Sequence, residues 1–365
     1  MRLDEPGLYE RPEAKEFLAQ LRTELDGFCE GMRSAEAVLL KLHHEINSVV
    51  FLGVGGSGIV GDLLSDITTR CRSVPIICHK DYSFPSYITK DALVVAVSYS
   101  GNTAETLSAM VKAYDAGLSM FAITSGGLMG KICKKLRIPM VEVRTGLLPR
   151  MAVPYMLGAA MSVLERVGAI KISTDELKNA VERARFAQQS VEVHVGLESN
   201  LAKQVASCIY DKIPFIYSHG PLSSVGYRLK CQLNENAKML AVNQCLPEIL
   251  HNDIEGWSPA VANCLTAIVL RCKDEHPAIR EALDNMETVL GERFGIAVSR
   301  IVCEGNDEIT KILSAMVVCD YISFYTAMMR GVDPVRVDRI KSMREGIISN
   351  VKLLEQVARR FGVEL

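Results

Sequence analysis

The sequence predicts an α/β fold with two parallel β-sheets, each flanked by helices on both faces. Short apolar runs bounded by turn residues alternate with amphipathic helical patterns, which indicates repeated strand–helix–strand units. This alternation occurs between residues 48 and 150 and resumes at residue 214, with a purely helical stretch in between. A length of 365 residues also suits two domains better than one.

The first alternating stretch accounts for one sheet. Two amphipathic helices are expected over residues 8–47, and helical patterns near 59–70, 103–116 and 128–136 separate the apolar runs. Ligands of such sheets bind at the carboxyl ends of the strands. The expected strands are Ser48–Gly53, Val74–Cys78, Leu93–Ser98, Met120–Thr124 and Pro139–Val143.

The second stretch repeats this layout after three helical segments within residues 151–211. Its strands are Pro214–Ser218, Leu265–Arg271 and Ile296–Cys303, with helices over 222–238, 276–291 and 307–330. Pro334 ends the last of these helices, and a final amphipathic helix runs to about residue 360. The expected organisation is therefore N-terminal helices (1–47), a first sheet domain (48–150), a second with connecting helices (151–335) and a C-terminal helix (336–365).

Composition argues against several classes of function. The 41 basic and 43 acidic residues nearly balance, which disfavours nucleic-acid binding. No run of about 18 apolar residues marks a membrane span, and Met1–Pro6 lacks the pattern of a signal peptide, so we expect a cytoplasmic protein. The 11 cysteines form no C-x-x-C and the seven histidines no H-x-x-x-H, so neither a disulfide nor a metal site is expected. His219 is assigned a structural role.

Two strand-ending loops carry the residues of a phosphate site. Gly53–Gly58 (GVGGSG) and Ser98–Thr103 (SYSGNT) each follow an apolar strand and precede a helix. Backbone N–H groups, hydroxyls and a helix N-terminus together bind phosphate well. Asn102 with Glu105 predicts an N-cap and its reciprocal partner. The candidate phosphate-binding residues are Gly56, Ser57, Ser98, Ser100 and Thr103.

The first loop also satisfies the dinucleotide pattern G-x-G-x-x-G, which alone is a weak signal. That fingerprint requires an acidic residue at the end of the second strand to bind the ribose. Here His79 and Lys80 precede Asp81, which makes NAD a poor fit.

The two loops resemble those of the sugar isomerase (SIS) family, over residues 48–145. Three later segments are similar to archaeal-type bifunctional phosphoglucose/phosphomannose isomerases: Leu147–Tyr155 (LLPRMAVPY), Val225–Lys238 (VGYRLKCQLNENAK) and Pro247–Trp257 (PEILHNDIEGW). The resemblance implies two SIS domains, each a flavodoxin-like three-layer sandwich. It also implies interconversion of glucose 6-phosphate with fructose 6-phosphate, extending to mannose 6-phosphate in the bifunctional members.

The resemblance assigns roles to particular residues. Glu235 is the base that moves a proton between C1 and C2 through a cis-enediol, and Arg150 stabilises its negative charge. His251 opens the sugar ring and is donated by the neighbouring subunit of a homodimer. No metal ion or cofactor is implied.

One position departs from the family pattern. Counting from Gly331-Val332-Asp333-Pro334, the family's helper lysine aligns with Arg344, while Lys341 lies one helical turn earlier. Arginine cannot exchange protons usefully, so either Lys341 takes the role after a small shift, or ring opening rests on His251, or the activity is altered. Two alternatives remain open: a non-catalytic regulator that binds sugar phosphates, and an NAD(P)-dependent oxidoreductase.

Overall fold

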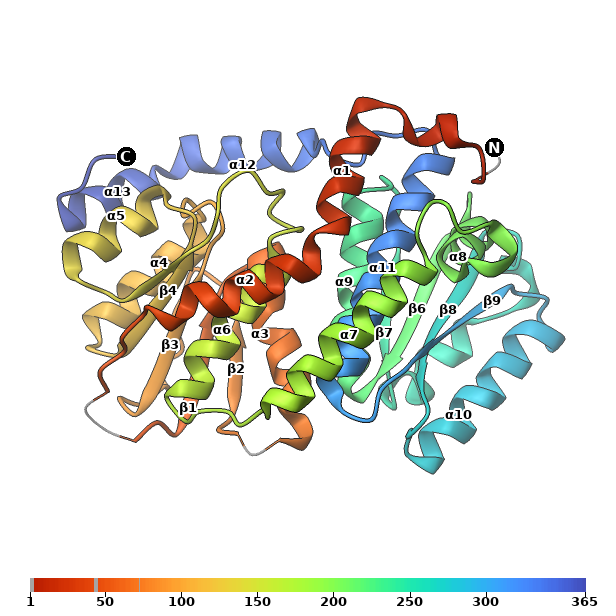
Figure 1. Cartoon of the computed structure of the whole chain (residues 1–365), viewed down its shortest axis with the longest axis horizontal. Helices are drawn as coiled ribbons and strands as arrows, with labels where there is room; N and C mark the ends of the chain where they lie inside the picture. Colours follow the sequence, from red (N-terminus) through yellow and green to blue (C-terminus); the bar gives the residue numbers. More distant parts are fainter. Residues whose placement is uncertain (1–2, 43–44, 72) are drawn as a thin grey trace. The chain divides into compact units, whose positions relative to one another are not determined.

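The structure is a computed structural model that describes residues 3–42, 45–71 and 73–365. The chain forms two compact units (Figure 1). Unit 1 holds the residues up to Arg22 together with Ser173–Arg336, and unit 2 holds Thr23–Ile172 together with Val337–Leu365. Each unit contains one parallel sheet, as the sequence predicted.

Unit 2 is built on a five-stranded sheet in the order β2-β1-β3-β4-β5. Side chains alternate between its two faces: Phe51 of β1 packs under Gly61 of α3, whereas Leu52 joins an apolar cluster with Leu107 of α4. α4, α5 and α13 share this second face, where Val357 of α13 enters the same cluster (Figure 1). The strands are β1 Ser48–Leu52, β2 Ile76–His79, β3 Ala92–Val97, β4 Ser119–Thr124 and β5 Met140–Glu142. The helices are α2 Glu24–Glu36, α3 Gly55–Ile67, α4 Ala104–Asp115, α5 Gly127–Leu136, α6 Val153–Arg166, α12 Asp338–Val351 and α13 Leu353–Phe361.

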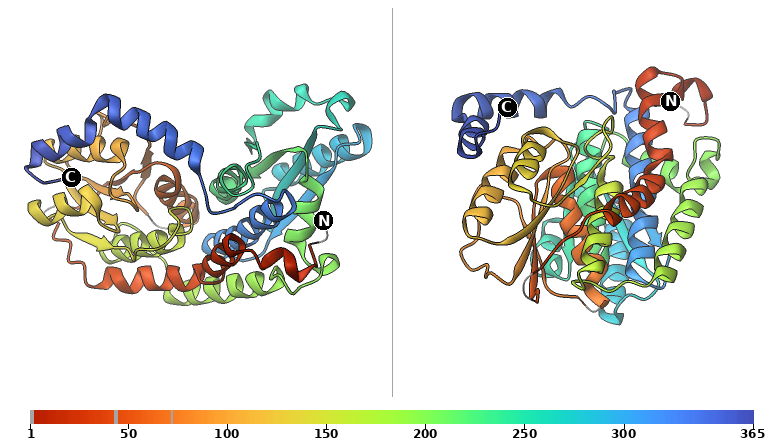
Figure 2. Two further views of the ribbon diagram at one scale, coloured as in Figure 1. Left: turned by 90° about the horizontal axis from the view of Figure 1, so that it is seen from above. Right: turned by 60° about the vertical axis from the view of Figure 1, so that its left-hand side comes forward.

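Helix α6 belongs to unit 2 because it packs closely along α2 (Figure 2). A Cβ on Gly31 of α2 would lie 2.0 Å from the Tyr155 carbonyl oxygen, and one on Gly158 of α6 would lie 2.2 Å from that of Phe28. Two helices approach this closely only where a residue has no side chain. The chain passes between the units at 22/23, 172/173 and 336/337, whereas boundaries were expected at 47/48, 150/151 and 335/336.

Unit 1 contains a four-stranded parallel sheet in the order β7-β6-β8-β9. Helix α11 lies against α7, α8 and α9, and most of its residues are buried. It is long and apolar enough to span a membrane, yet 94% of its most apolar window is buried inside the protein, as expected for a core helix. The strands are β6 Ile213–His219, β7 Val242–Leu246, β8 Leu265–Cys272 and β9 Val298–Cys303. The helices are α1 Pro12–Arg22, α7 Thr174–Ser190, α8 Leu201–Ile209, α9 Ser223–Glu235, α10 Pro277–Thr288 and α11 Glu308–Met329.

The two sheets share one topological feature. In unit 2 the chain leaves β1 for β2 on one side and then crosses to β3 on the other, and in unit 1 it leaves β6 for β7 and then crosses to β8. Each crossing creates a switch point, where adjacent strand ends diverge and open a crevice for ligands. The loops after β1 and β3 therefore share one crevice, and those after β6 and β8 share another.

Three expectations about individual elements were wrong. The segment β7 was not expected as a strand, because its sequence VNQCL is polar and only half-buried. The C-terminal segment forms two helices because Lys352 takes a left-handed conformation between α12 and α13. The N-terminal helical pattern ends at Glu36 rather than near residue 47. The part of that expectation that covers residues 43–44 lies outside the described residues.

Candidate active site

The switch point of unit 2 brings together two helix N-termini that no side chain caps. Helix α3 begins at Gly55 after β1, and α4 begins at Ala104 after β3; neither N-cap residue makes a side-chain capping bond. The first-turn N–H groups of both helices thus have neither an intrahelical acceptor nor a side-chain cap. Helices α5, α6 and α9 likewise have no side-chain cap from their N-cap residues, whereas α7, α8 and α11 are capped by Ser173, Asn200 and Asp307. The positive ends of two helices that start at one switch point are an arrangement suited to an anion.

The hydroxyls of the second loop hold its shape around this site. Ser98 Oγ and Thr103 Oγ1 lie 2.8 Å apart, and the Gly101 N–H donates to Ser98 Oγ at 3.1 Å. Because Thr103 pairs with Ser98, it does not cap α4, although it occupies the N-cap position. Ser98 and Thr103 are buried, while Ser100 is exposed and accepts from the Asn102 N–H at 3.3 Å.

The first loop is joined directly to the second. Ser57 Oγ accepts a hydrogen bond of 3.1 Å from the Tyr99 N–H. Gly56 lies against the chain segment after β5: an added Cβ would be 3.0 Å from the Pro149 carbonyl oxygen and 3.2 Å from Arg150 Cα. Of the residues predicted from sequence, the structure therefore brings together Gly56, Ser57, Ser98, Ser100, Thr103 and Arg150.

The prediction for Asn102 was wrong. Asn102 does not cap α4; its Oδ1 instead accepts from the Leu128 N–H at 2.8 Å, in the first turn of α5. The loops before α4 and α5 are in close contact, since a Cβ on Gly127 would lie 2.3 Å from the Ser100 carbonyl oxygen. This proximity, which local sequence does not reveal, diverts the Asn102 side chain to the neighbouring helix.

Tyr99 supports the segment that carries Arg150, a role that the sequence did not suggest. Its hydroxyl accepts from the Leu147 N–H at 2.8 Å and donates to the Arg144 carbonyl at 3.2 Å. Arg150 itself is only 3% exposed. Because the Arg150 backbone lies against Gly56 in the first turn of α3, this buried arginine is a candidate fixed cation for an anion.

Glu235 is the last residue of α9 in unit 1, and a polar row aligns that helix against α11. Arg228 and Gln232 donate to Asp320 at 2.5 and 2.9 Å, and Asn236 donates to Ser323 Oγ at 2.9 Å. Arg228, Gln232 and Asn236 are spaced at four-residue intervals and so lie on one face of the helix. All five side chains are buried.

Two cationic side chains hold the end of α9, where Glu235 is half-buried. Lys238 Nζ donates to the carbonyl oxygens of Glu235 and Arg336, at 2.5 and 2.6 Å. Arg330 Nε donates to the Ala237 carbonyl at 3.0 Å. Cations at a helix C-terminus satisfy its last carbonyls and stabilise its dipole. The backbone that bears Glu235 is thereby fixed.

The segment Pro247–Trp257, which carries His251, is anchored to β6, while His251 itself is exposed. Tyr217 donates to Asp253 Oδ2 at 2.7 Å and accepts from Trp257 Nε1 at 2.7 Å. These buried or half-buried contacts hold residues 253–257, just after His251. The His251 side chain is exposed, and no described residue is hydrogen-bonded to its ring.

Lys341 and Arg344 both lie on α12 of unit 2, and both are exposed. Lys341 Nζ is 3.9 Å from Glu345 Oε1, a pair one helical turn apart. The charge of Arg344 acts on Tyr82, whose phenol pKa is nevertheless raised because burial outweighs it. The predicted site residues thus divide between the units, with Glu235 and His251 in unit 1 and the others in unit 2.

Asp81, the candidate ribose ligand of the dinucleotide alternative, is engaged in its own turn. Its Oδ1 accepts from the backbone N–H groups of Tyr82 and Ser83 at 2.5 and 3.4 Å, which lowers its pKa. Lys80 next to it pairs with Asp62. The geometry therefore gives no support to a dinucleotide site.

Comparison with known proteins identifies the family. The chain is 32% identical over 299 residues to the bifunctional phosphoglucose/phosphomannose isomerase of Aquifex aeolicus, covering 81% of this chain and 89% of the relative. The chain belongs to the bifunctional phosphoglucose/phosphomannose isomerase family of SIS-domain proteins. The corresponding protein of Caldicellulosiruptor bescii is 31% identical over 304 residues, covering 82% of this chain and 89% of the relative. Residues 198–347 match the family model of the bacterial phospho-glucose isomerase C-terminal SIS domain.

Solved structures bear out the SIS-like fold. The C-terminal domain of glucosamine-fructose-6-phosphate aminotransferase from Francisella tularensis superposes with a TM-score of 0.67 at 14% identity, covering 88% of this chain and 98% of that one. At this identity the likeness concerns the fold alone. Membership of the isomerase family rests on the sequence relatives.

Proposed function

We propose that this member of the isomerase family interconverts glucose 6-phosphate, and also mannose 6-phosphate, with fructose 6-phosphate. The observation that carries the proposal is the pair of uncapped helix N-termini in unit 2, beside the buried Arg150. Such a site suits the dianionic phosphate of a hexose 6-phosphate, with Gly56, Ser57, Ser98, Ser100 and Thr103 around it.

The proposed chemistry is a proton shuttle. His251 opens the pyranose ring, with Lys341 as its helper on the sugar oxygen. The Glu235 carboxylate then removes the proton from C2 of the open aldose while O1 gains a proton, which gives the cis-enediol. Glu235 returns the proton to C1 as O2 loses its own, which gives the ketose. Arg150 stabilises the negative charge that develops on the oxygens.

Several structural features support the assignment of Glu235. A general base must be held in place, and α9 is fixed both by the buried row to Asp320 and Ser323 and by the cations at its end. The base and the fixed guanidinium supply what a Lewis acid would otherwise supply, so the proposed mechanism needs no metal ion.

We further propose that the chain acts as a homodimer in the cytoplasm, in which the exposed His251 reaches the neighbouring subunit's site.

The test is substitution of Glu235 by glutamine, which keeps the size of the side chain and removes the base. We expect the conversion of fructose 6-phosphate to fall by at least about 100-fold, the usual effect of losing a general base. Glu281→Gln, which alters an exposed glutamate of α10, is the matched control and should leave the rate unchanged. Full activity in Glu235→Gln would refute the assignment.

Exchange of substrate hydrogens with solvent distinguishes the isomerase from the non-catalytic regulator. The regulator is favoured by Arg344, which stands where the family has its helper lysine. In deuterium oxide, the wild-type protein should incorporate deuterium at C2 of glucose 6-phosphate and at C1 of fructose 6-phosphate. Tight binding of either sugar without exchange would instead identify a sensor. The same assay in EDTA should give an unchanged kcat, provided that circular dichroism confirms the fold.

A further inference from the structure

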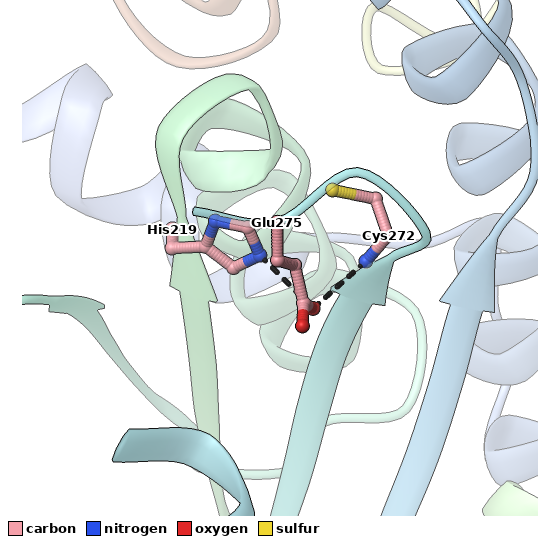
Figure 3. Close-up of side chains that lie close together, drawn as sticks. All are labelled: His219, Cys272 and Glu275. Atoms are coloured by element: carbon pink, nitrogen blue, oxygen red, sulfur yellow. Dashed lines mark hydrogen bonds and ion pairs between the residues drawn. The ribbon is translucent and has the colours of Figure 1, made fainter. Parts of the chain in front are cut away.

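The switch point of unit 1 holds a buried cluster of metal-ligand type in place of the glycine and serine loops of unit 2. His219 ends β6, Cys272 ends β8, and Glu275 lies in the turn after β8 (Figure 3). One ligand atom from each residue lies within 4.8 Å of those of the others. The exposed fractions of the three residues are only 5, 5 and 7%, respectively. The cluster thus occupies the crevice in which α/β sheets bind their ligands.

The imidazole of His219 is buried beside the carboxylate of Glu275. Its Nε2 atom is buried and hydrogen-bonded to no described residue, although it faces Glu275 Oε1 at 3.4 Å. Two ligands bound at 2.0–2.1 Å with a tetrahedral angle lie roughly 3.4 Å apart. The observed separation therefore suits a shared metal ion.

Glu275 is held in place by a network of its own. Arg271 donates to both its carboxylate oxygens at 2.9 and 2.8 Å, and the Cys272 N–H donates to Oε1 at 3.0 Å. Arg271 is shared with Asp284 and Glu287, which accept from its Nη1 at 2.8 Å each. The charge of Glu275 is therefore only partly neutralised. Outer partners of this kind orient a metal-binding carboxylate.

The second cation of the region is already occupied. Lys311 Nζ pairs with Asp274 Oδ2 at 2.7 Å and with Glu308 Oε2 at 3.2 Å. It is fully buried, as expected for a lysine held by two carboxylates. Lys311 is therefore paired with Asp274 and Glu308, while Glu275 is paired with Arg271 and faces His219.

We propose that His219, Cys272 and Glu275 bind one zinc ion, which joins the carboxyl ends of β6 and β8. Imidazole nitrogen, thiolate sulfur and carboxylate oxygen are the donors that zinc prefers, and a water molecule completes the tetrahedron. Binding displaces the thiol proton of Cys272 to solvent. The site lies entirely within unit 1 and contains none of the residues assigned to proton transfer. An ion that binds only the folded chain also stabilises the fold.

Cobalt(II) tests this site, because it replaces zinc and reports its ligands by absorption. Protein freed of metal by chelation and dialysis is titrated with cobalt, first as the wild type. We expect one equivalent per chain, visible d–d bands and a thiolate-to-cobalt charge-transfer band that zinc then abolishes. Absence of that band at one equivalent would overturn the proposal.

Variants identify the ligands. Cys272→Ser should lose the charge-transfer band, and His219→Gln should weaken binding by more than about tenfold, the lower limit for losing even an outer-shell partner. Cys264→Ser, at the opposite end of β8 and exposed, is the matched thiol control and should keep both the band and the affinity. A band that persists in Cys272→Ser would refute the ligand set.

Thermal stability gives a measurement that depends on neither colour nor activity. Zinc at roughly a hundred times its Kd should raise the Tm of the wild type and of Cys264→Ser by about 5 °C. At the same zinc concentration the Tm of His219→Gln should rise by about half as much or less, because its binding is at least about tenfold weaker. This variant still decides the matter if Cys272→Ser does not fold. An equal rise in His219→Gln and the wild type would show that zinc acts elsewhere.

Discussion

Arg228 and Asp320 form an ion pair inside unit 1, where both side chains are almost completely excluded from water. Arg228 Nη2 lies 2.5 Å from Asp320 Oδ2, and the exposed side-chain fractions are 3 and 0%. Gln232, one turn further along α9, donates to the other oxygen of the same carboxylate. This pair fixes the register of α9, which carries Glu235, against α11.

Asp320→Asn should therefore both destabilise the protein and slow it. Removing one partner of a buried ion pair leaves the other charge uncompensated, which costs about 3–5 kcal/mol of unfolding free energy. The urea midpoint should fall, and kcat should fall in the protein that remains folded, because α9 can shift. Asp115→Asn, which breaks the exposed pair with Arg360, is the control and should leave the midpoint unchanged. Equal midpoints in the two variants would contradict this account.

Gly56→Ala should impair substrate binding without unfolding unit 2. Its Cβ would lie 3.0 Å from the Pro149 carbonyl oxygen and so push away the segment that carries Arg150. The neighbouring backbone must move by a few tenths of an ångström, so we expect kcat/KM to fall, by less than the roughly 100-fold that a misplacement of 1 Å can cost. In Gly130→Ala of α5 the nearest atom to the new Cβ is 4.0 Å away, so this control should keep wild-type kinetics and gain up to about 1 kcal/mol. Wild-type kcat/KM in Gly56→Ala would show that the contact is unimportant.

Mixing two inactive variants tests whether His251 is shared between subunits. Glu235→Gln and His251→Ala are expected to be inactive separately. If each site combines Glu235 of one subunit with His251 of the other, a heterodimer regains one intact site. Random exchange after mild denaturation should then restore roughly a quarter of wild-type activity, because half of the dimers are mixed and half of their sites are intact. Size-exclusion chromatography checks that dimers re-form. Mixtures that stay inactive would place both residues on the same subunit.

The two strand-to-helix loops after β1 and β3 could be predicted from sequence because their signal is local. An apolar strand, a glycine or hydroxyl cluster and a helical pattern are adjacent in the chain at Gly53–Gly58 and at Ser98–Thr103. The division into alternating strands and helices was confirmed for the same reason. Strand β7 was not predicted because its sequence is polar and only half-buried. Its pairing with β6 depends on tertiary contacts that the local sequence does not show.

Long-range contacts could not be predicted from a single sequence. Asn102 was assigned to the helix that follows it, but its partner Leu128 comes from the next strand–helix unit. Asp320 lies 92 residues from Arg228, and nothing in either local pattern indicates the other. The same is true of His219 with Cys272 and Glu275: the turn after β8 brings Cys272 and Glu275 together, but only the sheet brings His219 beside them.

Acid should weaken unit 1 at the contact between Glu192 and Arg22. Burial alone would raise the pKa of Glu192, but hydrogen bonds from Arg22 at 2.7 Å and from Tyr321 at 2.5 Å outweigh it and hold the pKa below its usual value. A lowered pKa in the folded state means that the unfolded chain takes up the proton first. The stabilisation is therefore complete above the unfolded pKa of about 4.3 and is lost as the pH falls through the lower folded value. Urea unfolding of the wild type and Glu192→Gln should thus show a gap in unfolding free energy that is largest near pH 6 and shrinks towards pH 3. Glu182→Gln, which alters an exposed glutamate of α7, should show no such gap. A gap in Glu192→Gln that widened on acidification would reverse the sign of this coupling.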